Sequence, residues 1–121
     1  MVNIDINNNV TVTRGDSFKR PLFLNSGTDL KPSRYILKDS DEVYLGIMEP
    51  NQPFENSIVR KKFTKNDLNS NGDVVISISS SDTEKLIPGT YYYQIKAKFI
   101  NEDLTYDVNT VVQKTKFVIE E

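Results

Sequence analysis

The sequence predicts an all-β fold, an antiparallel β-sandwich of about seven to eight strands. Apolar residues occur in short runs in which every second side chain is apolar, and turn-forming residues separate these runs. The clearest run covers residues 91–99 and follows Pro88-Gly89, so we expect it to be the central strand. One face of this strand would lie in the core: Tyr91, Tyr93, Ile95, Ala97 and Phe99.

The residues before the central strand predict further strands joined by polar turns. Residues 10–13 form either a second strand or a continuation of the first, and Pro21 favours an edge position or a bulge for the strand that contains it. Residues 25–34 have the composition of a loop. The expected strands are residues 2–6, 10–13, 17–25, 42–49, 58–63 and 74–79.

One short helical turn is expected between Ser81 and Leu86, with Ser81 or Asp82 as its cap. After the central strand, residues 101–103 predict a hairpin loop, followed by a strand at 104–107 and a last strand at 110–120. The sequence contains no repeat or linker, so residues 1–121 are expected to form a single β-sandwich domain.

Composition argues against several classes of function. The formal net charge of -2 argues against nucleic acid or an anionic membrane as the main partner, and a membrane-spanning or signal-peptide segment is not expected. The chain has no cysteine, which supplies the thiol nucleophile of many enzymes. It also has no histidine, the commonest general base and metal ligand. We therefore expect a protein that is not an enzyme and needs no cofactor or small-molecule substrate.

The triplet Arg14-Gly15-Asp16 has the letters of an integrin-binding motif but lies between two expected strands. Gly15 supplies the positive φ that a tight turn needs, and Asp16 is a common acceptor in turns. The sequence therefore favours a structural turn.

Residues 67–74 match the first positions of an EF-hand calcium loop, with oxygen ligands at Asp67, Asn69, Asn71 and Asp73. The twelfth position, which should be glutamate, is Ile78, and a strand is expected after Gly72. Asn71-Gly72 between alternating runs is a strong hairpin signal. A hairpin turn is therefore favoured, and a weak calcium site is the alternative.

The polar face of the central strand is the candidate partner-binding surface. Its residues are Tyr92, Gln94, Lys96 and Lys98. The run Tyr91-Tyr92-Tyr93 has a second interpretation as a sugar-stacking platform. The chain has no tryptophan, which argues against that interpretation.

Segments spread over most of the chain resemble a group of small bacteriophage structural proteins. They are the run from Thr13 to Phe18 (TRGDSF), residues 82–95, which include LIPGTYYYQI, and residues 110–119. They are similar to the N-terminal domain of the baseplate upper protein of siphophages that infect low-GC Gram-positive bacteria. Gln94 stands where that pattern commonly has an acidic residue, and Lys114 or Lys116 stands near its glycine.

This resemblance implies an immunoglobulin-like β-sandwich without catalytic residues. It implies a structural or adaptor protein of the virion, in the tail baseplate, the neck or the capsid, assembled in the cytoplasm of the bacterial host. The expected partners are other virion proteins and further copies of the same chain, as a homo-oligomer. The alternative function is a carbohydrate-binding or adhesion module on a phage or bacterial surface.

Overall fold

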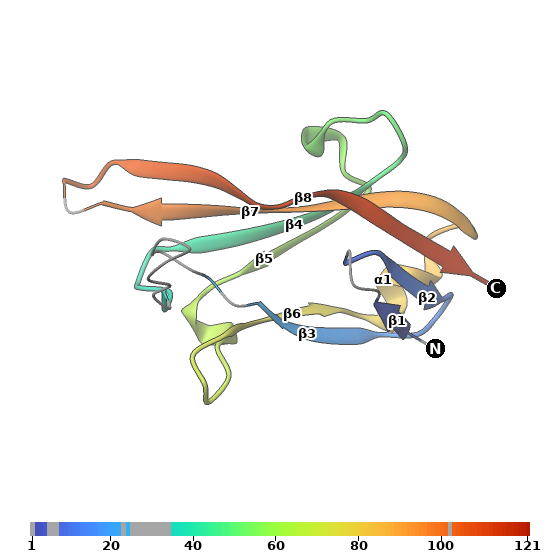
Figure 1. Ribbon diagram of the computed structural model, residues 1–121, viewed down its shortest axis with the longest axis horizontal. Helices are drawn as coiled ribbons and strands as arrows, with labels where there is room; N and C mark the ends of the chain where they lie inside the picture. Colours follow the sequence, from blue (N-terminus) through green and yellow to red (C-terminus); the bar gives the residue numbers. More distant parts are fainter. Residues whose placement is uncertain (1, 5–7, 23, 25–34, 102) are drawn as a thin grey trace.

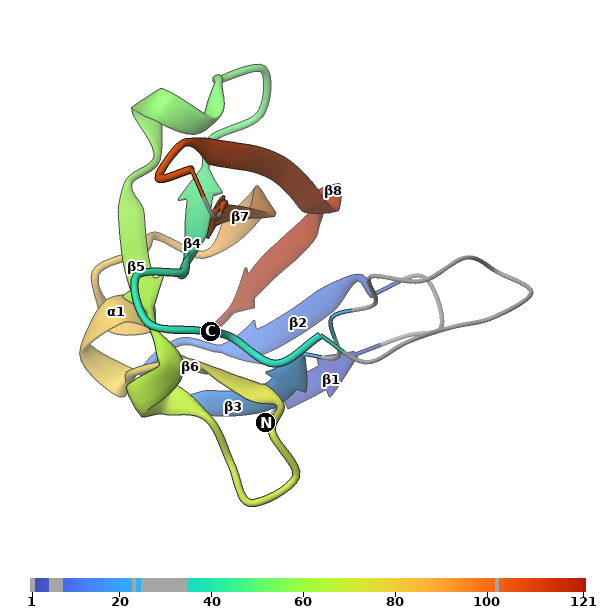
Figure 2. The ribbon, with the colours of Figure 1, turned by 90° about the vertical axis from the view of Figure 1, so that its left-hand side faces the viewer.

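Two layers of β-sheet face each other in the computed structural model, which describes residues 2–4, 8–22, 24, 35–101 and 103–121 (Figure 1). The strands form a six-stranded and a two-stranded sheet, and one end of the larger sheet curls into the layer of the smaller one (Figure 1 and Figure 2), so the predicted all-β fold is confirmed. In spatial order the larger sheet contains β1 (Val2–Ile4), β2 (Val10–Thr13), β8 (Tyr106–Glu120), β7 (Gly89–Ile100), β4 (Glu42–Met48) and β5 (Val59–Phe63). The smaller sheet pairs β3 (Phe18–Leu22) with β6 (Val74–Ile78).

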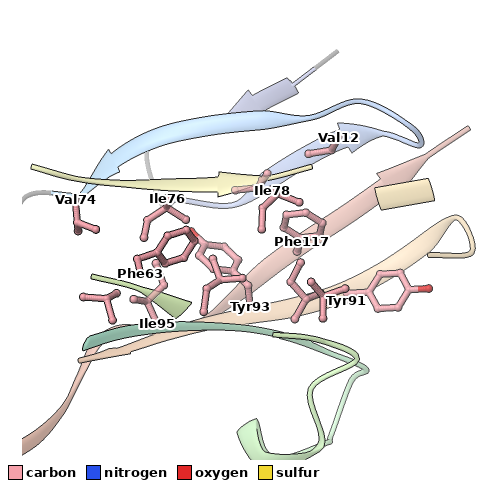
Figure 3. Packing of buried hydrophobic residues seen from close by; sticks show 14 of the residues in the cluster. Val12, Phe63, Val74, Ile76, Ile78, Tyr91, Tyr93, Ile95 and Phe117 are labelled. Carbon is pink, nitrogen blue, oxygen red and sulfur yellow. The ribbon is translucent and has the colours of Figure 1, made fainter. Parts of the chain in front are cut away.

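The core lies between the two sheets, and β7 supplies much of it (Figure 3). β7 pairs with β4 on one side and β8 on the other, so its predicted interior position is confirmed. Its inner face is buried as the alternation predicts, with Phe99 half-buried at the end. The buried tyrosines keep their hydroxyls bonded: Tyr91 donates to the carbonyl of Ile87 and Tyr93 to that of Asn8, each at 2.7 Å. These bonds remove the cost of burying a polar group.

The prediction that all strands are antiparallel is wrong at one position, because β2 runs parallel to the end of β8 (Figure 2). Val10 is level with Phe117 and Val12 with Ile119, and all four side chains are buried. Alternation specifies which face of a strand is buried and carries no information on the direction of its neighbour. The parallel arrangement buries these four side chains, as the alternation requires.

Several predicted boundaries differ from the structure. The strands expected at 104–107 and 110–120 are one strand, β8, whose register with β7 shifts near Ile95. Such bulges displace the alternation and make one strand resemble two. Among the described strands β3 pairs only with β6, which agrees with the first of the two options, an edge position or a bulge, that Pro21 indicates. The expected loop at 25–34, and the ends of the first strand at 5–6 and the third at 23 and 25, lie outside the described residues.

The predicted helical turn exists, but it begins earlier than expected. The helix α1 is Ser80–Glu84 and its N-cap is Ser79, whereas Ser81 or Asp82 was expected as the cap. The Ser79 hydroxyl accepts from the Asp82 amide, and the Asp82 carboxylate accepts from the Ser79 amide at 3.0 Å. This reciprocal capping box satisfies main-chain donors at the start of the helix. Two short 3₁₀ turns, η1 (Phe54–Asn56) and η2 (Lys65–Asp67), complete the elements.

Asp82 links this capping box to the larger sheet, and its loss should make the protein less stable. Its carboxylate lies 2.7 Å from Lys61 Nζ of β5. Burial alone would raise the pKa of Asp82, but the hydrogen bonds from Lys61 and Ser79 outweigh it and lower the pKa. We expect Asp82→Asn to reduce the free energy of unfolding by about 1–2 kcal/mol at neutral pH.

The pH dependence of this effect follows from the sign of the shift. A carboxyl with a lowered pKa in the folded state contributes stability above its unfolded pKa of about 3.9, and loses it as the pH falls through the folded value. The difference in unfolding free energy between the wild type and Asp82→Asn should therefore shrink steadily below about pH 4. Urea unfolding at several pH values measures it, with the exposed neighbour variant Glu84→Gln as control. A difference that stays constant through the acid range would contradict the assignment.

Candidate interaction surface

The predicted partner-binding residues share the outer face of the six-stranded sheet, on the side opposite the core. Tyr92, Gln94, Lys96 and Lys98 are level with Met48, Gly46, Tyr44 and Glu42 of β4. All four are half-buried rather than exposed. The alternation therefore predicts correctly that these side chains point away from the core. Another segment of the chain covers part of this outer face.

The cover is the segment 49–58, which follows β4 and folds back over the outer face (Figure 1, green). Gly46 and Met48 lie on this face and are nevertheless buried. Ser57 and Phe54 rest on Gly46: a Cβ atom there would be 2.2 Å from Ser57 Oγ and 2.9 Å from Phe54 Cε2. Glycine at position 46 thus permits the close approach of this segment.

Two lysines, one from β7 and one from β8, hold segment 49–58 in place. Lys114 Nζ of β8 donates to the carbonyl of Gln52 at 2.6 Å, and Lys96 Nζ lies 4.9 Å from the centre of the Phe54 ring. Lys96, predicted as a contact for a partner, therefore contacts its own chain. The part of the predicted surface next to Gly46 is an intramolecular contact.

We expect Gly46→Ala to displace segment 49–58 from the sheet. The added methyl cannot coexist with Ser57 Oγ at its present position, and overpacking of this kind costs about 1–3 kcal/mol of unfolding free energy. Limited proteolysis between residues 49 and 58 should become faster, and urea unfolding gives the energy. Ser57→Ala removes the clashing oxygen, so the double variant should recover part of the loss; equal loss in both backgrounds would refute the contact.

The other part of the outer face carries charges that are paired with one another. Lys62 forms an ion pair with Glu42 and thereby lowers the pKa of Glu42. Burial raises the pKa of Tyr44, and its hydrogen bond to Glu42 raises it further. Lys98 Nζ lies 4.0 Å from the centre of the Tyr106 ring. These side chains form a polar network whose members hold each other in position.

Beyond this network the β7–β8 hairpin extends past the rest of the sandwich as an arm, defined by residues 98–101 and 103–108 (Figure 1). Three large apolar side chains of the arm are exposed: Leu104 at 76%, Tyr106 at 48% and Val108 at 65%. Sequence reasoning places Tyr106 near the exposed Tyr92 but does not single out Leu104 or Val108, although the spacing of two between Tyr106 and Val108 in a polar stretch is a signal for an apolar strand face.

The calcium candidates form a tight turn before β6. Leu68 pairs with Val74 across it, and Gly72 has a φ of 83°. Asn69 Oδ1 accepts from the amides of Asn71 and Asp73 at 2.9 and 3.0 Å, and Asp67 accepts from the Thr64 amide. The Asn69 oxygen thus stabilises the turn, and the Asp67 oxygen caps η2. In the part of the chain that the structure describes, no group of three or more acidic, histidine or cysteine side chains is placed to hold a metal ion.

The Arg14-Gly15-Asp16 triplet also forms a turn, and the turn is docked on α1. Arg14 Nε donates to the Glu84 carbonyl at 2.9 Å. The Gly15 amide donates to Thr83 Oγ1, which itself donates to the Asp16 carbonyl. The arginine and the backbone of the triplet thus connect the turn between β2 and β3 to the helix.

A cavity of about 100 Å³ between the sheets is smaller than the roughly 300–1,000 Å³ of typical ligand pockets. Its one charged lining residue, Arg20, donates to Asn8 Oδ1 at 2.6 Å, so this group is already partnered. Across the described ranges, no helix has the length and apolarity to cross a membrane. Comparison with protein-family models, curated proteins and solved structures gave no match.

Proposed function

We propose that this chain is a structural or adaptor protein of a bacteriophage virion, in the tail baseplate, the neck or the capsid. In this proposal it acts through contacts with other virion proteins and with copies of itself, and it is assembled in the host cytoplasm. The resemblance of the TRGDSF, LIPGTYYYQI and C-terminal segments supports the phage origin and an immunoglobulin-like arrangement of the two sheets. The absence of histidine and cysteine from the sequence supports a role without catalysis.

The single observation that carries a role in protein–protein contact is the arm. Exposed large apolar side chains gather on it, beside the polar network of the outer face. Apolar groups rimmed by polar residues are typical of protein interaction sites. The rigid two-sheet body would then serve to position the arm.

Detection of the chain in purified particles tests the proposal. Particles from a culture that carries the gene are separated by density and digested for mass spectrometry. We expect the chain in a fixed ratio to the major tail or capsid proteins, and immunogold labelling should place it on one structure of the particle. Recovery only from the particle-free fraction would overturn the proposal.

The alternative of a carbohydrate-binding or adhesion module requires open aromatic ring faces. On the outer face Lys98 lies over the Tyr106 ring, and the Tyr44 hydroxyl is engaged with Glu42. This arrangement favours the structural role. A glycan array run beside light scattering separates the two: sugar binding by a monomer would support the alternative.

A further inference from the structure

In the described part of the chain, the edge of β8 along the arm is open. β2 pairs only with the last part of β8, from Phe117 to Glu120, and among the described residues no strand pairs with β8 before that point on this side. Every residue from Tyr106 to Thr110 is exposed. An open strand edge presents unpaired main-chain donors and acceptors and is a template for pairing with another strand.

This edge lacks the protection found at the opposite edge of the same sheet. There, β5 presents the basic run Arg60-Lys61-Lys62, the kind of charge that blocks edge-to-edge pairing. From Leu104 to Gln113 the only charged residue is Asp107. The register shifts of β8 begin beyond Thr110, so residues 106–110 form a regular stretch available for pairing.

Leu104, at the tip of the arm, has a backbone conformation that is unfavourable for leucine. Its φ is 68°, in the left-handed region that a branched residue adopts at a cost and that glycine or asparagine adopts readily. Its side chain is the most exposed of the large apolar side chains in the described residues. The turn itself is held by bonds between Asn101, Asp103 and Thr105, so the leucine side chain adds nothing to it. A contact with another molecule would give this exposed side chain a role.

We propose that two copies of this chain associate through this edge, in an antiparallel β8–β8 pair with its two-fold axis at Val108. This inference rests on the proposed function and specifies its self-contact. In such a pair Val108 is opposite Val108, Asp107 opposite Asn109, and Tyr106 opposite Thr110. No like charges are directly opposed, the two Asp107 residues being diagonal to each other, and valine and aromatic–threonine pairs are favourable across strands. The strand is thus complementary to itself, as a two-fold interface requires.

The contact is short, so we expect a concentration-dependent equilibrium between monomer and dimer in solution. Small interfaces are weak in isolation and gain strength when many copies are held together. Sedimentation equilibrium of the full chain over a wide concentration range measures the dissociation constant. A wild-type chain that remains monomeric throughout overturns the proposal.

Because position 108 would face itself, charge variants give a specific test. Val108→Lys and Val108→Glu should each raise the dissociation constant by about tenfold or more. An equimolar mixture of the two should associate at least as well as wild type, as a heterodimer. Ile87, which is 74% exposed before the opposite end of β7, is the matched control: Ile87→Lys and Ile87→Glu should change nothing, alone or mixed. Thermal melts check that every variant is folded.

Leu104→Gly supplies an independent readout. It should weaken association several-fold without lowering the melting temperature, because glycine fits the left-handed conformation. Self-association that the Val108 variants leave intact would overturn the edge pairing but not the virion role. Detection in purified particles of a chain that is monomeric in solution would likewise remove only the edge pairing, whereas absence from particles removes the proposed function.

Discussion

Replacing Phe117 with alanine is expected to reduce the free energy of unfolding by about 3–5 kcal/mol, the usual cost of truncating a fully buried phenylalanine. Phe117 is 1% exposed and is in contact with both layers. Its ring centre lies 6.0 Å from that of Phe18 in β3 and 6.2 Å from that of Tyr93 in β7. The cavity left by alanine would therefore lie between the two sheets (Figure 3).

Urea unfolding measures this loss, and Phe54→Ala is the matched control. Phe54 is half-buried under Lys96 on the outer face, away from the core, so its truncation should cost about 1 kcal/mol. Similar losses for the two variants would show that Phe117 does not join the sheets as described.

The inner face of the sandwich was predictable because each strand has one buried side. In β7 a period of two is sufficient to identify the core residues Tyr91, Tyr93, Ile95 and Ala97, whatever lies beyond them. The capping box of α1 was also present in the sequence, as a serine three residues before an aspartate. The expected cap at Ser81 or Asp82 is wrong because the Ser79–Asp82 pair begins the helix earlier than the apolar residues that follow it indicate.

Features that depend on distant parts of the chain were not predictable. Gly46 in a strand indicates a close approach of some other group, but only the fold shows that the group is Ser57. For the candidate surface, alternation predicts the face that carries Tyr92 to Lys98 and cannot predict that segment 49–58 covers part of it. The parallel pairing of β2 with β8 likewise depends on residues more than a hundred positions apart, such as Val10 and Phe117.

Asp41 is the clearest example of a residue whose role the sequence conceals. In the polar run Asp39-Ser40-Asp41 it resembles a solvated loop residue, yet it is 1% exposed. Its Oδ1 accepts from the Ile100 amide at 2.9 Å, at the base of the arm. Its Oδ2 accepts from the Lys38 amide at 2.9 Å and from the Tyr35 hydroxyl at 2.5 Å. One carboxylate thus connects the segment before β4 to the end of β7.

We expect Asp41→Asn to reduce the free energy of unfolding by about 2–4 kcal/mol. An asparagine has one acceptor oxygen, so whichever way its amide turns, the NH₂ group faces a main-chain N–H. A buried donor is then left without an acceptor, at the full cost of its desolvation. Urea unfolding measures the loss, and hydrogen exchange at the Ile100 amide should become faster because that bond anchors the base of the arm.

Two further variants separate the carboxylate's role from a general effect of charge. Asp39→Asn changes the same charge on a side chain that is 78% exposed, so it should alter stability by less than about 0.5 kcal/mol. Tyr35→Phe removes one of the three donors and should cost about 1 kcal/mol. If Asp41→Asn were no more harmful than Asp39→Asn, the carboxylate would not be holding the arm, and the rigid placement of Leu104, Tyr106 and Val108 would need another cause.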